Sequence, residues 1–202
     1  MGNKKSKNKK EDIKSPKFEL VKSFDQRSSI YYGFELKDGR FLFCIGGDSF
    51  DIYNINDLNN IKKDIKIYPP SYTVSCTQTK NGNIVVCCYV KDMVIYSIKE
   101  NTEEKIQTIS AEQDRENFVS ELSNGQLITM NWTGRIKLFD LVNGLYKEVK
   151  CFEPLTSFNA SKMKEIENYK IIINGWNISN EDSKNPLYFC DINTETTKMI
   201  KD

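Results

Sequence analysis

Short apolar runs alternate with polar breaks along most of the chain, and three such stretches align with one another without a gap. Residues 37–55, 80–98 and 123–141 are related by an offset of 43 residues each time. Each stretch contains an Asp-Gly or Asn-Gly pair, an apolar run, a polar break and a second run that ends aromatic–polar–aliphatic. Asp-Gly and Asn-Gly favour tight hairpins, because both central positions of a type I′ turn require positive φ. The pattern therefore predicts repeated antiparallel β-hairpins.

A looser fourth copy, with a longer internal break, occupies residues 168–192. The runs that follow the turns, at 41–45, 84–90 and 171–173, are apolar throughout, so both of their faces are expected to be buried. Further strands are predicted at 105–109, 148–152 and 198–200, and an additional copy of this strand precedes the first unit at 17–24. Four strands in a period of about 40–45 residues are typical of β-propeller blades.

The predicted fold is therefore an all-β, propeller-like array of about four four-stranded antiparallel blades. The expected division is a basic tail at 1–16 followed by blades at approximately 17–67, 68–109, 110–152 and 153–202. The 186 residues after the tail hold about four periods of 43. This number predicts an incomplete or open propeller, which is either completed by a second copy or another chain or truncated from a longer protein.

Residues 133–144, TGRIKLFDLVNG, resemble the closing segment of a WD repeat, where a glycine turn leads into a strand that ends in Trp-Asp. The corresponding pairs here are Phe139-Asp140, Tyr53-Asn54, Tyr96-Ser97 and Cys190-Asp191. The Gly-His pair of that family is absent, since the chain contains no histidine. Over residues 17–202 the resemblance implies a scaffold that displays loops to protein partners, usually without catalysis.

The first 17 residues, MGNKKSKNKKEDIKSPK, differ from the rest of the chain in charge. They carry a local charge of +5, which leaves −4 for the remainder of a chain whose formal net charge is +1. No apolar residue lies between Met1 and Ile13, so residues 1–16 are expected to be disordered.

The start of this tail matches the M-G-x-x-x-[ST] motif, in which Gly2 is acylated with myristate. The segment MGNKKSKNKK also resembles the start of Src-family kinases over about ten residues. That resemblance implies a membrane anchor without kinase activity, because no kinase motif follows it.

A single myristoyl chain binds membranes weakly, and a nearby lysine adds about 1 kcal/mol at an anionic surface. The tail supplies five such residues, Lys4, Lys5, Lys7, Lys9 and Lys10. We therefore expect peripheral attachment of a cytoplasmic protein to the inner leaflet. The alternative is a solubilising basic tail that is not acylated.

Residue usage excludes several kinds of chemistry. Without histidine, the chain cannot use Ser-His-Asp or Cys-His catalysis or an imidazole metal ligand. The six cysteines, at 44, 76, 87, 88, 151 and 190, form no C-x-x-C pair and are expected to be reduced, mostly apolar core residues. The near-neutral net charge argues against nucleic-acid binding, and no apolar run approaches the roughly 20 residues of a membrane-spanning helix. We expect no catalytic residue, cofactor or metal.

The candidate partner-binding residues lie between the second and third strands of each unit, at 46–49, 91–92, 132–135 and 176–186. In the WD-repeat resemblance these loops open on one face of the disc. Trp and Arg are over-represented among interface hot spots, so Trp132, Arg135 and Trp176 are the candidates; the alternative is that the indoles pack between blades. The predicted function is a membrane-tethered interaction scaffold. The alternative is a propeller enzyme or a phosphoinositide-binding propeller with a site built from loops.

Overall fold

The computed structural model of the chain describes residues 29–45, 47–57, 60–89, 92–99, 102–110, 116–153, 158–177 and 186–200. Within these ranges the chain forms four antiparallel sheets of four strands each, and no other regular element. In every sheet the strands follow chain order from one edge to the other. We call the sheets blades 1 to 4. The predicted all-β array of four-stranded antiparallel units is confirmed.

Each blade is one continuous segment of the chain. Blade 1 consists of β1 (Ile30–Glu35), β2 (Phe41–Ile45), β3 (Ser49–Asn54) and β4 (Lys62–Ile67). Blade 2 consists of β5 (Thr73–Gln78), β6 (Ile84–Cys88), β7 (Asp92–Lys99) and β8 (Thr102–Ser110). Blade 3 consists of β9 (Glu116–Glu121), β10 (Leu127–Asn131), β11 (Ile136–Val142) and β12 (Leu145–Phe152). Blade 4 consists of β13 (Phe158–Glu167), β14 (Lys170–Asn177), β15 (Leu187–Asp191) and β16 (Thr196–Ile200).

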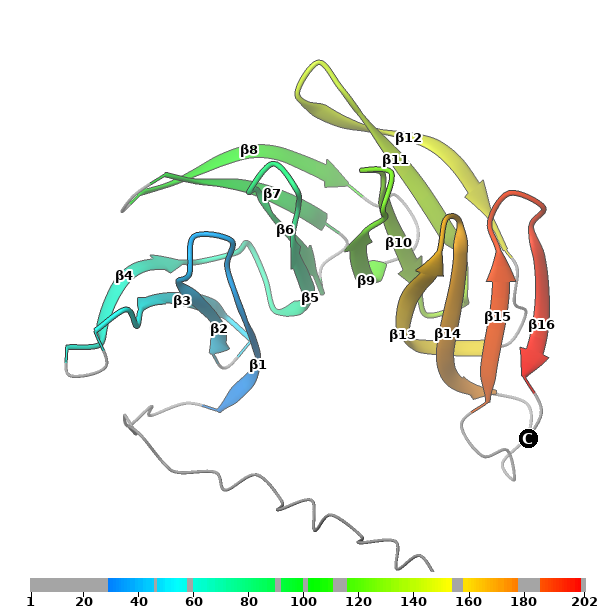
Figure 1. Cartoon of the computed structure of the whole chain (residues 1–202), viewed down its shortest axis with the longest axis horizontal. Coiled ribbons are helices and arrows are strands. Elements are labelled where there is room, and N and C mark those ends of the chain that lie inside the picture. Colours follow the sequence, from blue (N-terminus) through cyan, green and yellow to red (C-terminus); the bar gives the residue numbers. More distant parts are fainter. Residues whose placement is uncertain are drawn as a thin grey trace, which may run out of the picture.

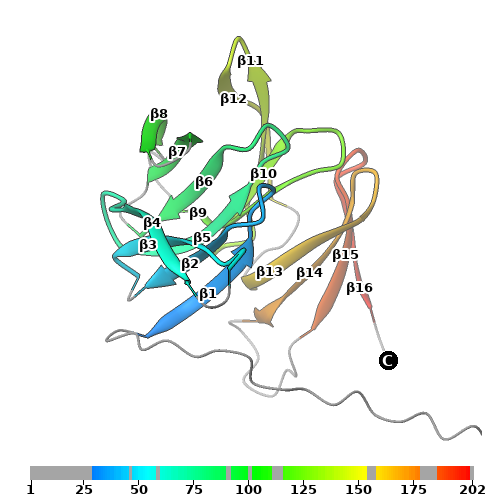
Figure 2. The same ribbon diagram turned by 60° about the vertical axis from the view of Figure 1, so that its left-hand side comes forward.

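The four blades stand side by side along an arc (Figure 1), with the first strand of each blade on the inner side and the last strand on the outer side. Blades 1 and 4 occupy the two ends of the arc, as the turned view also shows (Figure 2). The predicted extra strand at 17–24 lies outside the described residues.

The hydrophobic core is divided into three layers, one between each pair of neighbouring blades. Strand β6 shows why the second strand of a blade is apolar at every position. Its Ile84 and Val86 pack against blade 1, whereas Val85 and Cys87 pack against blade 3. All five residues of β6 and all five of β10 are buried. The predicted burial of both faces is thus confirmed for these strands.

The Asp-Gly and Asn-Gly hairpins form, but their turns are not of type I′. Positive φ occurs only at the glycines, Gly39, Gly82 and Gly125, with values of 83°, 90° and 91°. In blade 1 the Leu36 N–H donates to the Arg40 carbonyl and the Gly39 N–H donates to the Leu36 carbonyl, so the loop is longer than two residues. The preceding Asp or Asn keeps negative φ, because its side-chain oxygen accepts the N–H two residues ahead, as Asp38 does from Arg40 at 3.0 Å.

Two consecutive residues with positive φ occur instead at Asn143 and Gly144, with φ of 51° and 81°. This pair joins β11 to β12, and Val142 faces Leu145 directly across it. The dihedral signs are those of a type I′ turn. The turn type predicted for the first hairpin of each blade is therefore found in the third hairpin of blade 3.

Candidate functional site

The connections between strands define two sides of the arc. In an up-and-down sheet, the first and third connections leave from one edge and the second connection leaves from the opposite edge. We call the edge with the β1–β2, β5–β6, β9–β10 and β13–β14 connections the turn side. The opposite edge, with the β2–β3, β6–β7, β10–β11 and β14–β15 connections, is the loop side. The partner-binding residues predicted from the sequence belong to the loop side.

On the loop side, the β10–β11 connection is held in one conformation by the buried side chain of Asn131. The Asn131 carboxamide oxygen accepts hydrogen bonds from the Thr133 N–H at 3.0 Å, the Thr133 hydroxyl at 2.9 Å and the Arg135 N–H at 2.8 Å. The Trp132 side chain, 39% exposed, is presented on this ordered loop. An exposed indole on a fixed loop suits an interface, since the loop loses little conformational freedom on binding.

Arg135 is already engaged within the chain. Its guanidinium donates to the Glu153 carboxylate, with Nε 2.6 Å from Oε1. Trp176 lies in β14, but its side chain is outside the described part of the structure. Gly2 and the five lysines of the tail are also outside the described residues. The structure therefore places Trp132 and Arg135 on one loop and does not place the remaining candidates.

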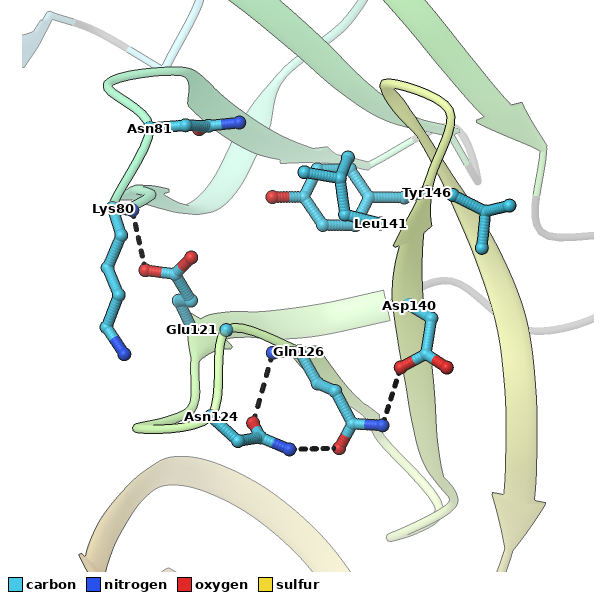
Figure 3. A pocket seen from close by; sticks show the side chains of 10 residues that line it. Lys80, Asn81, Glu121, Asn124, Gln126, Asp140, Leu141 and Tyr146 are labelled. Atoms are coloured by element: carbon cyan, nitrogen blue, oxygen red, sulfur yellow. Dashed lines mark hydrogen bonds between the residues drawn. The ribbon is translucent and has the colours of Figure 1, made fainter.

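A pocket of about 440 Å³ opens on the turn side, where blades 2 and 3 meet (Figure 3). Its lining comes from the β5–β6 turn, the β9–β10 turn and the β11–β12 hairpin. The polar groups that converge on it are those of Lys80, Asn81, Glu121, Asn124, Gln126, Asp140 and Tyr146, and Leu141 adds an apolar wall. A concave site with several polar groups and one apolar wall is suited to binding a ligand such as a peptide.

Hydrogen bonds between and within the turns fix the polar wall. The Lys80 N–H in blade 2 donates to the Glu121 carboxylate in blade 3 at 2.6 Å. The Asn124 side chain donates to the side-chain oxygen Oε1 of Gln126 at 2.7 Å, and Nε2 of Gln126 donates to the Asp140 carboxylate at 2.6 Å, as Figure 3 shows. Partial burial raises the pKa of Glu121, against the opposing effect of Lys80. The wall is preorganised before any partner binds.

The β11–β12 hairpin extends beyond the pocket and beyond the body of the arc (Figure 1). Close to its turn the hairpin is attached to blade 2 through the Gln107 carboxamide, which donates to the Tyr146 carbonyl and accepts from the Tyr146 N–H, both at 2.8 Å. Its tip carries three exposed aliphatic side chains, Leu141, Val142 and Leu145, at 44%, 38% and 42% exposure. Apolar side chains clustered at a projecting tip are typical of an interaction site.

A buried ion pair lies between blades 2 and 3 and offers no open site. The Lys137 ammonium is 3.3 Å from the Glu116 carboxylate, and both side chains are largely buried. Burial raises the pKa of Glu116, and Lys137 opposes this only in part. Burial alone would lower the pKa of Lys137, but the charges of Glu116 and Glu148 and the hydrogen bond to Glu116 together raise it. This pair belongs to the core between the blades.

The cysteine thiols have raised pKa values, whereas a nucleophilic thiol has a lowered pKa. All six are free thiols. Burial raises the pKa of Cys76 to about 12 and that of Cys88 to about 11, and it also raises the pKa values of Cys44, Cys87, Cys151 and Cys190. A reactive thiol requires a lowered pKa. These thiols are therefore protonated near neutral pH.

Two further findings apply to the described residues. In these ranges no group of three or more His, Cys, Asp or Glu side chains is placed to hold a metal ion. Within the same part of the chain, no helix has the length and hydropathy needed to cross a membrane.

No protein-family model and no curated protein sequence matches the chain. Solved structures do match it. The structure of YCF48 bound to D1 peptide aligns with a TM-score of 0.64 at 10% identity, covering 88% of this chain and 55% of that one. The N-terminal domain of Nup159 aligns with a TM-score of 0.58 at 10% identity, covering 86% of this chain and 47% of that one.

The structure of S. cerevisiae Dbp5 bound to Nup159, Gle1, IP6 and ADP aligns with a TM-score of 0.57 at 10% identity, with coverage of 86% and 47%. These similarities establish a β-propeller-like fold. The chain spans about half the length of the chains that it matches.

The pocket and the hairpin were not among the candidates predicted from the sequence. A signal for them exists in the residues Leu141, Val142 and Leu145, which surround the Asn143-Gly144 turn: three aliphatic side chains at a hairpin tip have no core to enter. The sequence also contains a signal for Glu121 in the polar wall. Residues with a side-chain oxygen recur at its position in each unit, as Gln78, Glu121 and Glu165, at spacings of 43 and 44 residues.

Proposed function

We propose that this protein is a non-catalytic interaction scaffold of WD-repeat type, and that its partner binds on the turn side at the pocket and the β11–β12 hairpin. The observation that carries the proposal is the exposed cluster of Leu141, Val142 and Leu145 beside a preorganised polar wall. Apolar contacts at the tip would supply affinity, and the amides and carboxylates of the wall would select the partner.

Two further points support a binding role. The similar propellers were solved with a D1 peptide and with Dbp5 and Gle1, so this architecture accommodates protein ligands in those molecules. The raised thiol pKa values argue against cysteine nucleophiles, and the lack of histidine removes the imidazole base. An extended peptide with aliphatic side chains fits the mixed lining of the pocket.

The proposal includes a tether at the N-terminus. Acylation of Gly2, together with the lysine cluster, would hold the scaffold at an anionic membrane surface on the cytoplasmic side. Replacement of Gly2 by alanine would then move the protein from the membrane fraction to the soluble fraction. An unchanged distribution would remove the tether from the proposal and leave the binding surface in place.

The binding surface is tested by comparing the proteins that co-purify with three variants. Leu141→Ser with Leu145→Ser should lose the partners that wild type captures, because the apolar tip is removed. The matched control, Val149→Ser, changes an aliphatic residue that is 50% exposed on the same β12 strand but away from the tip. Trp132→Ala tests the loop side: loss of partners with that variant alone would contradict the turn-side proposal.

A further inference from the structure

The face of blade 4 that points away from blade 3 repeats the residue pattern by which each of the other blades packs on the blade that follows it. In blades 1 to 3, paired apolar residues on the second and third strands face the following blade and are no more than 3% exposed. The pairs are Leu42–Ile52, Val85–Ile95 and Ile128–Leu138. The same register in blade 4 pairs Ile172 with Phe189. These two side chains are only half-buried, and the adjacent Leu187 is 40% exposed.

The set continues onto the last strand, where Ile200 pairs with Leu187 and is 43% exposed. One position differs, because Asn174 stands where the inner blades have Cys44, Cys87 and Met130. The face of blade 4 thus has an apolar centre, and the exposed Lys164 and Lys198 flank it as the cross-strand partners of Ile172 and Phe189.

The opposite end of the arc carries the other half of such a junction. In blades 2 and 3, the residues that face the preceding blade pair as Ile84–Tyr96 and Leu127–Phe139, all buried. The matching pair in blade 1 is Phe41 with Tyr53. The Phe43 ring lies 6.2 Å from that of Phe41 and 5.8 Å from that of Tyr53. A side chain at Gly33 would come within 2.6 Å of the Phe43 ring, so this ring packs closely against β1 at Gly33.

A hydrogen bond also repeats at every internal junction. The N–H of the first turn residue in one blade donates to the side-chain oxygen at the end of the first strand in the next blade. The three bonds are Lys37 to Gln78 at 2.8 Å, Lys80 to Glu121 at 2.6 Å and Ser123 to Glu165 at 2.6 Å.

Both partners of a fourth such bond are present at the ends of the arc. Glu35 is the equivalent acceptor in blade 1, since it pairs with Phe41 as Glu121 pairs with Leu127. It is exposed, and no described residue donates a hydrogen bond to it. The equivalent donor position in blade 4, two residues after Glu165, is the backbone N–H of Glu167.

We infer that a second copy of this chain closes the propeller, with blade 4 of each copy packed on blade 1 of the other. The interface would continue the three junctions that already exist within the chain, and both of its halves are present in one sequence. Because the contact is head-to-tail and is made twice, two copies form a closed ring of eight blades, within the range of known propellers. The inference is independent of the partner surface on the turn side.

The mass of the full chain in solution tests this assembly. Sedimentation velocity or light scattering should give twice the 23.4 kDa of one chain at micromolar concentration, and dissociation to monomer on dilution. A monomer throughout the range up to about 100 μM would overturn the inference, since that dissociation constant corresponds to only about 5–6 kcal/mol. A polydisperse series of larger species would overturn the closed ring.

Substitutions on the two faces test the geometry. Leu187→Glu with Ile200→Glu should weaken dimerisation at least about 100-fold, because two aliphatic side chains lose their burial. The matched control, Leu145→Glu with Val149→Glu, alters two equally exposed aliphatic residues of blade 3 and should leave the dimer intact. Equal effects of both pairs would overturn the assignment of the interface.

Mixing variants tests the head-to-tail arrangement. Phe41→Glu damages blade 1, and circular dichroism of this variant reports whether it remains folded. Folded Phe41→Glu and Leu187→Glu/Ile200→Glu chains should each be monomeric alone and should form a one-to-one heterodimer when mixed, because one junction stays intact. A Phe41→Glu chain that still forms a dimer alone would show that blade 4 binds blade 4 and would overturn the inference.

Substitutions of Glu35 test the polar contact of the interface. Glu35→Gln should keep the dimerisation affinity, since Gln78 serves at an internal junction, whereas Glu35→Leu should reduce that affinity.

Discussion

Blades 3 and 4 use the same register of strands, and yet only blade 3 is covered on both faces. Ile128 and Ile172 occupy equivalent positions in their second strands, but Ile128 is fully buried and Ile172 is half-exposed. The difference arises from the neighbouring blade, because the local sequence pattern is the same. In a repeat protein each unit depends on its neighbours for burial. A substitution at either end of the arc should therefore lower the free energy of unfolding by less than the equivalent substitution at its centre.

The largest expected difference concerns these two isoleucines. Ile128→Ala should lower the free energy of unfolding by about 3 kcal/mol, because it leaves a cavity in the core between blades 3 and 4. Ile172→Ala, measured in the Leu187→Glu/Ile200→Glu background so that blade 4 stays uncovered, should cost about 1 kcal/mol or less. Urea unfolding followed by circular dichroism gives both values. Equal costs would contradict the comparison.

A second difference concerns charged residues at equivalent positions of the third strand. Lys137 in blade 3 faces Thr129, and Asp51 in blade 1 faces Phe43 in the same register. The Lys137–Glu116 pair is covered by blade 2, whereas the partner of Asp51, Lys63, is 44% exposed at the end of the arc. Lys137→Met should cost about 3 kcal/mol at neutral pH, because it leaves a buried carboxylate without its partner. Lys63→Met should cost less, about 1–2 kcal/mol, because Lys63 itself is largely solvated, although the Asp51 carboxylate that it leaves is only 2% exposed.

The cost of Lys137→Met should depend on pH in a defined direction. Burial already raises the pKa of Glu116 above 4.5, and removal of Lys137 would raise it further. An acid with a raised folded pKa contributes its full stability below its unfolded pKa and loses it as the pH rises through the folded value. Urea unfolding between pH 4 and pH 8 should therefore show a penalty that grows with pH. A Glu116→Gln/Lys137→Met chain should recover most of the stability and lose this dependence; a penalty independent of pH would exclude the buried carboxylate as its cause.

The sequence predicted the parts of the fold that repeat. The offset of 43 residues and the continuous apolar run in β6 were sufficient to predict four-stranded blades buried on both faces. The turn type was predicted wrongly because an Asn-Gly pair is compatible with two geometries. In the first hairpins an Asn or Asp side chain accepts a hydrogen bond from the backbone, and this contact is not encoded in the dipeptide.

The pocket could not be predicted because three connections from two blades form it. Glu121 and Asp140 lie on two strands of blade 3, and Lys80 joins them only when blade 2 packs on blade 3. Trp132 is a candidate because tryptophan is informative by residue type alone, and its role in binding stays a prediction. Which side of the arc a partner uses remains a prediction for the experiments above.

The smallest expected effect is a difference in acid sensitivity between the first turn of blade 1 and the first turns of blades 2 and 3. Asp38 takes the position that Asn81 and Asn124 hold in the other two turns, and its carboxylate also accepts from the Arg40 guanidinium at 2.7 Å. Partial burial alone would raise the pKa of Asp38, but the hydrogen bonds and charge of Arg40 hold it below 3.8.

An acid with a lowered folded pKa contributes stability above its unfolded pKa and loses it as the pH falls through the folded value. Because the Asp38 side chain is 49% exposed, the contribution should be less than about 1 kcal/mol. Amide hydrogen exchange provides an internal control, since the Leu36, Thr79 and Leu122 N–H groups make the same bond in the three turns. Between pH 5 and pH 3, protection corrected for the intrinsic rate should fall at Leu36 and stay level at Thr79 and Leu122. Asp38→Asn should make the three turns respond alike, whereas a parallel fall at all three in wild type would place the acid sensitivity outside Asp38.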